Sequence, residues 1–190
     1  MIDRKEFMKG CGAAICAAGL SCAAKADQSR SQSQAECQLE EDRLHDSEGK
    51  LDRGQTRFAG FIESLENRFD EQERKQLFNG FGRHCAQTYR ASLLDHYKGD
   101  IRGFLDEGLR GWMAEASYDE AAGTIRVVDK SPTCTCPLVK MGTTPPSFCD
   151  CTLGWQQEAY STILGRPVRA ELEESLLRGG KRCVFRITVV

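Results

Sequence analysis

The chain has 190 residues, of which 40% are hydrophobic and 28% charged, and its formal net charge is -2. This length is enough for one domain with a hydrophobic core of its own. The small net charge gives no electrostatic reason to expect nucleic acid or anionic lipid as a partner. Because no run of about 18 apolar residues occurs, we expect no membrane span in the mature chain. The unusual feature of the composition is its ten cysteines.

The first 26 residues predict an export signal. A basic start precedes a run of small uncharged residues over 11–24, and Ala24-Lys25-Ala26 fits the small-x-small pattern before a signal-peptidase cut. Residues 4–9 resemble the twin-arginine signal, with Lys5 in place of the second arginine. We therefore expect an exported protein of the periplasm or cell envelope, and the resemblance implies the twin-arginine route. Two alternatives stay open: a lipid anchor at Cys22, and an N-terminal helix that the mature protein keeps.

The segment 27–54 predicts a flexible leader, because it is rich in Ser, Gln, Asp and Glu and poor in large apolar residues. A short helix around 37–44 is the regular element that we expect within it. A single domain then covers 55–190. Its first half, 55–116, is predicted to be helical, since apolar residues recur there every three or four positions.

Local signals place the helices within that half. Asp70 and Glu73 form a capping-box pattern at a helix start. Gly80 and Gly82 weaken the helix that follows or let another segment approach closely. The last apolar stripe ends at Trp112 and is read as a further helix.

The second half, 117–190, carries strand patterns. Strands are predicted over 124–128, 168–172 and 183–189, with a turn at 178–181 joining the last two. A helix over 153–164 ends at Gly165. Helices thus come first, and a mainly antiparallel sheet with a Cys-rich loop region follows, which is an α+β fold.

Seven cysteines follow residue 26, and four of them form two Cys-x-Cys pairs separated by twelve residues: Cys134, Cys136, Cys149 and Cys151. Two such pairs on facing strands or loops can supply four sulfurs to one ion, the set that tetrahedral zinc prefers. Within a strand, each Cys-x-Cys points both side chains to one face. We therefore predict a zinc site, with Cys183 as a core residue or an extra ligand. Disulfides across the pairs and inert thiols are the alternatives.

Other residues are candidates for chemistry or binding. Cys85 follows His84 on a predicted helix and is a candidate nucleophile, although adjacent helical residues point about 100° apart and leave His84 poorly placed to activate it. Trp155, Phe148 and Trp112 are candidate aromatic residues for a pocket that takes a small apolar ligand, and plain core packing is the alternative for each. No Ser-His-Asp set, zinc-protease motif, phosphate loop or dinucleotide fingerprint was recognised in the sequence.

Three short segments, 151–155, 165–168 and 179–185, carry a family resemblance. On the basis of these three segments, residues 149–190 resemble the C-terminal part of V4R (4-vinyl reductase-like) domains. The resemblance implies a small-molecule-binding module for a hydrocarbon-like ligand, with cysteines that bind a metal. Ser175 stands where such domains often place a cysteine, so the Cys134-to-Cys151 cluster would take the part of that residue.

The longer pattern of Cys-x-Cys-Pro followed by Cys-x-Cys-x-x-Gly-Trp also resembles bacterial proteins grouped near aminothiazoline-carboxylate hydrolases. The function expected first is an exported small-molecule-binding domain with a four-cysteine metal site of mainly structural role. A metal- or thiol-dependent hydrolase is the alternative that the second resemblance implies. A thiol redox protein built from the same cysteines is the third hypothesis.

Overall fold

The computed structural model describes the backbone from Ala23 to Val190 and the side chains from Gln38 onward. The expected signal segment therefore lies almost entirely outside the described residues. The chain divides into two compact units, and the second of these, Lys50–Val190, holds the sheet and the helices that cover it. This second unit is the one that positions the candidate site.

Helix α2 (Ala23–Glu66) occupies the stretch where we expected a flexible leader. Its sequence lacks proline and is rich in Ala, Gln, Glu, Leu, Lys and Arg, which all have good helix propensity. Polar side chains one turn apart also support it, as where Gln38 donates to Asp42 at 3.2 Å. The scarcity of large apolar residues, on which the leader prediction rested, argues against a buried helix but not against an exposed one.

The helices that follow α2 are α3 (Glu71–Tyr89), α4 (Ala91–His96) and the short α5 (Ile101–Gly103), which continues into a π-helical turn over Phe104–Gly108. The predicted capping box is confirmed, since the Asp70 carboxylate accepts from the Glu73 N–H and the Glu73 carboxylate accepts from the Asp70 N–H. The helical half ends earlier than predicted. Trp112 lies in a turn, and a strand begins at the next residue.

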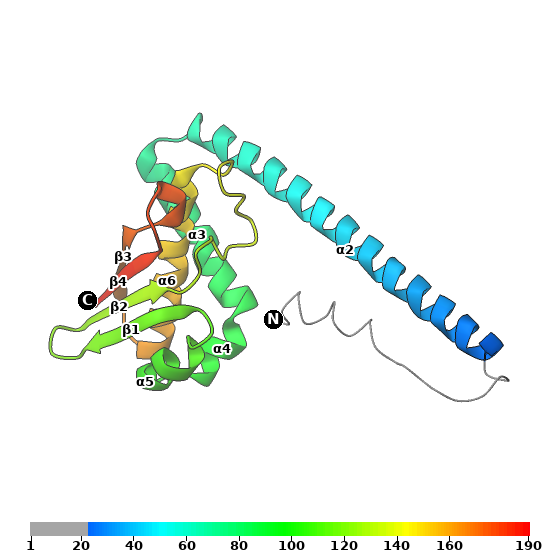
Figure 1. Ribbon diagram of the computed structural model, residues 1–190. Coiled ribbons are helices and arrows are strands. Elements are labelled where there is room, and N and C mark those ends of the chain that lie inside the picture. Colours follow the sequence, from blue (N-terminus) through cyan, green and yellow to red (C-terminus); the bar gives the residue numbers. More distant parts are fainter. Residues whose placement is uncertain (1–22) are drawn as a thin grey trace. The chain divides into compact units, whose positions relative to one another are not determined.

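The four strands are β1 (Met113–Asp119), β2 (Thr124–Asp129), β3 (Val168–Glu174) and β4 (Val184–Val189). They form one antiparallel sheet in the order β1-β2-β4-β3 (Figure 1). Helix α6 (Asp150–Leu164) follows a 3-10 turn over Pro146–Cys149 and ends at Gly165, whose φ of 66° is left-handed as the C-cap requires. A second 3-10 turn, Leu176–Arg178, joins β3 to β4. The predicted α+β class is thus confirmed.

The main core lies between α6 and one face of the sheet. Alternating residues of β2 and β4 are buried there against α6; the innermost side chains are Ile125, Val127, Ile187, Tyr160 and Ile163. The opposite face is charged, because Arg126 and Arg186 lie opposite each other in the strand register and both pair with Glu173. Helix α3 packs on α6 and completes the layer of helices (Figure 1).

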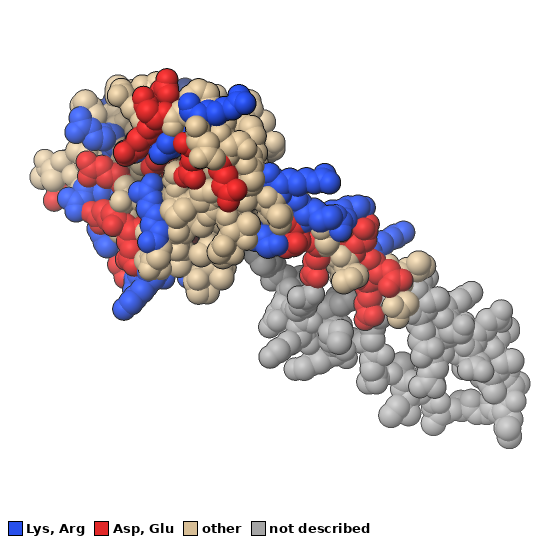
Figure 2. Space-filling model, turned by 90° about the horizontal axis from the view of Figure 1, so that it is seen from above, with Lys and Arg blue, Asp and Glu red and all other residues tan. Residues whose placement is uncertain are grey.

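On the face drawn in Figure 2, basic and acidic side chains are interspersed over the folded domain. Over the part of the chain that the structure describes, no helix combines the length and the apolar character needed to cross a membrane.

Candidate functional site

Helices α3 and α6 cross so closely that their backbones touch. A Cβ added at Gly82 would lie 1.8 Å from the carbonyl oxygen of Cys151, and one added at Gly154 would lie 1.9 Å from the carbonyl oxygen of Asn79. The sequence predicted that another segment could approach closely at Gly80 and Gly82. The structure confirms this at Gly82, whereas Gly80 faces open space. Because Cys85 follows Gly82 by about one helical turn, the crossing brings Cys85 toward the N-terminal end of α6.

The Cys-rich segment between β2 and α6 has turns but no strand or α-helix of its own. Polar contacts with α2 hold it in place. The side chain of Gln55 on α2 donates to the Pro137 carbonyl at 2.8 Å, and the Lys140 ammonium pairs with Asp52 at 2.6 Å. Cys134, Cys136 and Cys151 pack against a second apolar cluster, made of Ile62, Phe78, Val139 and Phe148. The loop therefore holds its two cysteines against α2, α3 and the start of α6.

Cys183 reaches the same region from the sheet. The Asp129 N–H donates to the Cys183 carbonyl at 2.9 Å, and the Asp129 carboxylate accepts from the Ser131 N–H at 2.8 Å. Cys183 thus lies beside the point at which the chain leaves β2 for the Cys-rich segment. Its side chain is partly buried against the main core, as the core interpretation of the sequence expected.

Burial raises the pKa of each of the six described thiols, and the neighbours that add to this rise show which sulfurs lie near one another. After burial, the pKa of Cys151 is raised by the sulfurs of Cys136, Cys85 and Cys149, and Cys85 also adds to the rise of the pKa of Cys136. These interactions join Cys85, Cys136 and Cys151 pair by pair. We call them the inner set.

The remaining three sulfurs are related in the same way. After burial, Cys183 and Cys134 add to the rise of the pKa of Cys149, and Cys134 also adds to the rise of the pKa of Cys183. We call Cys134, Cys149 and Cys183 the outer set. The two sets are not separate, because Cys136 also adds to the rise of the pKa of Cys134, and Cys149 adds to that of Cys151.

The arrangement corrects the geometry assumed from the sequence. We expected each Cys-x-Cys to point both sulfurs to one face, as in a strand. Cys149 ends a 3-10 turn and Cys151 lies in the first turn of α6, and two residues apart on a helix is a rotation of about 200°. The pair is therefore splayed. Cys85 joins the cluster although its spacing in the sequence gave no sign of it.

Backbone N–H groups donate to several of the sulfurs. Burial raises the pKa of Cys136, and the Leu138 N–H opposes this rise, while the Val139 N–H donates to the Cys136 carbonyl at 3.1 Å. Burial likewise raises the pKa of Cys183, which the Leu176 N–H opposes. Such donors favour the thiolate, which is the form of cysteine that binds metal ions.

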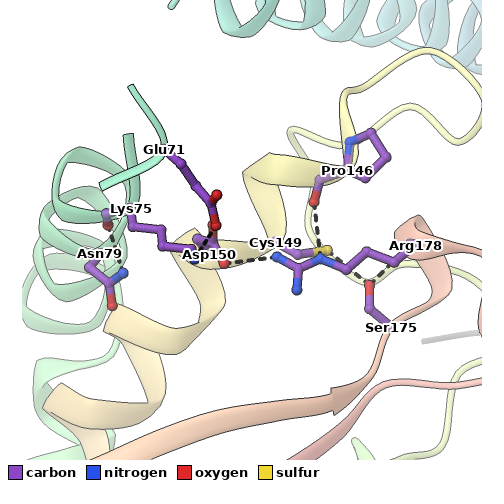
Figure 3. A network of polar contacts seen from close by, with 8 residues as sticks. All are labelled: Glu71, Lys75, Asn79, Pro146, Cys149, Asp150, Ser175 and Arg178. Atoms are coloured by element: carbon purple, nitrogen blue, oxygen red, sulfur yellow. Dashed lines mark hydrogen bonds and ion pairs between the residues drawn. The ribbon is translucent and has the colours of Figure 1, made fainter. Parts of the chain in front are cut away.

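A polar network borders the outer set at Cys149 (Figure 3). The Ser175 hydroxyl lies 3.0 Å from the Cys149 sulfur, and the Arg178 guanidinium donates to the Asp150 carboxylate at 2.8 Å and to the Pro146 carbonyl at 3.4 Å. Ser175 and Arg178 also line a surface hollow of about 280 Å³ between β3 and the turn that follows it. The sequence reasoning passed over Arg178. The position of Ser175, where V4R-like domains often have a cysteine, was the available signal for this part of the site.

The six described cysteines are free thiols. Within the described part of the chain, no three Cys, His, Asp or Glu side chains already converge on a point where a metal ion would be held. The sulfurs are gathered, but they are not arranged as ligands. A metal ion would have to draw them together, and rotation about χ1 moves a cysteine sulfur without moving the backbone.

The candidate nucleophile pair is not assembled. The His84 ring contacts the Thr88 hydroxyl at 3.4 Å, one turn along the same helix. Burial raises the pKa of Cys85, which leaves this thiol protonated at neutral pH. Neither observation favours a thiolate nucleophile at this position.

The three candidate pocket aromatics lie in different places. Phe148 belongs to the second apolar cluster, where its ring packs edge-on against Phe58 at 5.0 Å between centroids. Trp155 packs against the main core, and Trp112 lies under the Arg90 guanidinium at 4.3 Å. They do not line one pocket together. A second hollow, of about 390 Å³, lies at the end of α2 and contains none of the three.

No family model matches the chain, and a search of curated proteins gave no match. Among solved structures, trafficking protein particle complex subunit 3 from Naegleria fowleri, covalently bound to palmitic acid, is 8% identical with a TM-score of 0.49, over 75% of this chain and 96% of that one. The phenol-responsive sensory domain of the transcription activator PoxR, solved with phenol, is 15% identical with a TM-score of 0.48, over 71% of this chain and 74% of that one. Both similarities are too distant to transfer a ligand or an activity to this chain.

Proposed function

We propose that this protein is an exported, V4R-like small-molecule-binding domain in which a thiol-bound metal ion, zinc in the first instance, has a mainly structural role. The observation that supports the metal part is that six described thiols are free and partly buried, and that those of Cys134, Cys136 and Cys151 pack against one apolar cluster. The small-molecule part rests on the resemblance of residues 149–190 to V4R domains.

The donor set fits a soft metal ion. Thiolates are the ligands that zinc and copper(I) prefer, and backbone N–H groups already donate to the sulfurs of Cys136 and Cys183. Cys134, Cys136, Cys149 and Cys151 are the residues that would hold the ion, with Cys183 as an extra ligand. A bound ion would join segments that are otherwise connected through a loop with little regular structure. Closing this loop in the folded state favours folding, because metal-binding free energy adds to folding free energy.

A structural role suits a sulfur-rich site better than a catalytic one. A zinc ion with four sulfur ligands has no open position for water, whereas catalytic zinc keeps one. Burial also raises the pKa of the described thiols. A raised pKa keeps a thiol protonated, which opposes its use as a free nucleophile. We therefore rank the binding domain above the hydrolase and the redox protein.

The test is elemental analysis and native mass spectrometry of the full-length chain, purified under reducing conditions without added metal, together with a thiol count after denaturation. At least one zinc per chain is expected, with its loss and a lower Tm in Cys134→Ser and Cys149→Ser. Small molecules that copurify are identified from the same native spectra. A metal-free chain with few titratable thiols would overturn the proposal and make the cluster a disulfide staple.

A further inference from the structure

We infer that helix α2 pairs in parallel with the same helix of a second copy of this chain, along a stripe of residues that includes Leu44 and Leu51. The stripe lies on a part of the chain that the proposed function does not use. The inference is therefore independent of metal and ligand binding, and its test can fail or succeed by itself.

A strict spacing of seven residues defines the stripe. Residues at this interval in the sequence are Cys37, Leu44, Leu51, Phe58 and Leu65, and all of them belong to the single helix α2. On a straight helix, such a spacing drifts by about 20° per heptad, and it stays on one side only where two helices supercoil around each other. The spacing is therefore the pattern of a coiled-coil seam.

The C-terminal part of the stripe already has a partner within the domain. Phe58 and Leu65 are partly buried against the second apolar cluster. Leu44 and Leu51, in contrast, are 50% and 52% exposed. The same stripe is thus covered at one end and open to solvent at the other, and its open part offers apolar surface to another molecule.

The charges beside the open part identify the occupant as a second copy in parallel orientation. Arg43 and Lys50 each precede a leucine of the stripe, and Glu41 and Glu48 each follow a stripe residue by four positions. In a parallel pair of helices, these two flanks face each other across the seam. Arg43 then lies opposite Glu48 of the second copy, and two-fold symmetry gives this ion pair twice. An antiparallel pair would set the basic flanks against each other and the acidic flanks against each other.

The second row of the seam is polar, which limits the strength of the pairing. Ser47 stands in this row, and its hydroxyl donates to the Leu44 carbonyl at 2.8 Å. Because the hydroxyl is bonded within its own helix, burying it leaves no donor unpaired. The seam still gains only one leucine per heptad, and it ends near Gln55, whose side chain donates to the Pro137 carbonyl of its own domain. We therefore expect a dimer that dissociates on dilution.

Sedimentation equilibrium of the reduced full-length chain over a series of concentrations tests the pairing. We expect a monomer–dimer equilibrium, and Leu44→Gln should weaken it about tenfold or more, since each dimer loses two buried leucines. Leu39→Gln is the matched control: Leu39 is 57% exposed on the same helix but lies off the stripe. This variant should stay within about twofold of the parent. A chain that is monomeric at every concentration, or a dimer that both variants weaken equally or neither weakens, would overturn the inference.

Charge reversal tests the direction of the pairing. Arg43→Glu should weaken the dimer about threefold or more at low salt, because it sets two carboxylates against each other. Combining it with Glu48→Arg should restore the affinity of the parent, since the ion pairs are then only exchanged. A single reversal that leaves the dimer as strong as before, or makes it stronger, would overturn the parallel arrangement.

A cysteine placed on the stripe gives a second measure of direction. The background has four cysteines changed to serine: Cys11, Cys16, Cys22 and Cys37. In it, Leu44→Cys should form a disulfide-linked dimer on mild oxidation, because equivalent residues meet across a parallel seam. Leu39→Cys is the control and should remain a monomer on a non-reducing gel. Equal amounts of covalent dimer in both variants, or none in either, would contradict the pairing.

Discussion

Gly82 of α3 and Cys151 of α6 meet backbone to backbone, with room for a hydrogen atom but not for a methyl group. The contact fixes how far the two helices can approach. We expect Gly82→Ala to destabilise the protein by about 3 kcal/mol or more, because the atom in the way is a carbonyl oxygen and not the end of a flexible side chain. Urea unfolding followed by circular dichroism measures the loss.

Gly80→Ala is the matched control for this substitution. It lies on the same helix two residues earlier, and a Cβ added there meets nothing within 4 Å. Since alanine is the better helix former, this variant should gain about 0.5–1 kcal/mol. If both variants lost stability equally, helix propensity and not the crossing would explain the effect at Gly82.

The Asp150 carboxylate is buried, with 5% of the residue exposed, and Arg178 is its ion-pair partner. Arg178→Met should therefore cost about 1–3 kcal/mol, since it leaves a buried acceptor without its cationic partner. Adding Asp150→Asn should recover part of this loss by removing the charge. The comparison is by thermal unfolding, with Arg182→Met, an exposed arginine of the same β3–β4 connection, as the neutral control.

The outer face of the sheet predicts a pH dependence of stability. Arg186, followed by Arg126, holds the pKa of Glu173 below its ordinary value of 4.5. A carboxylate whose pKa is lowered by folding stabilises the protein above its unfolded pKa, and this contribution is lost as the pH falls through the folded value. The stability advantage of the parent over Glu173→Gln should thus be constant near neutral pH and shrink below about pH 4.5.

Urea unfolding at a series of pH values measures this difference. Glu171→Gln, two residues away on β3, is the comparison variant and should show a smaller dependence on pH. An advantage of the parent that grew on acidification would contradict the assignment of Glu173 as the partner of the two arginines.

Tyr160 is fully buried in the main core, and its hydroxyl has no hydrogen-bond partner among the described residues. Removing a hydroxyl that makes no bond removes only its desolvation cost. Tyr160→Phe should therefore be neutral or more stable by about 1 kcal/mol. Tyr89→Phe, at an exposed position, should leave Tm unchanged. A clear loss of stability in Tyr160→Phe would indicate that a bound water or ligand normally uses the hydroxyl.

The parts of the fold that the sequence predicted well are those with strong local signals. The capping box at Asp70, the helix that ends at Gly165 and the alternating residues of β2 and β4 all follow from nearest neighbours in the chain. Strand β1 was missed because Met113–Asp119 has no β-branched residue and is mostly exposed at the sheet edge. The length of α2 was not predicted because low hydrophobicity does not distinguish an exposed helix from an irregular segment.

The candidate site was predicted in part for the same reason. The two Cys-x-Cys pairs are visible in the sequence, so their involvement could be inferred. The splaying of the second pair could not be inferred, because it depends on Cys149 and Cys151 being helical and not extended. The recruitment of Cys85 depends on a crossing of two helices far apart in the chain, which no local pattern reports.

The order of the cysteines along the chain has a consequence for folding. The cluster draws its first member from α3 and its last from the residue before the final strand, with the others between them. Contacts of such high sequence separation form late, since the loops that they close cost the most entropy. The complete cluster can therefore exist only after β4 has joined the sheet, so a cluster that includes Cys183 marks the chain as fully folded.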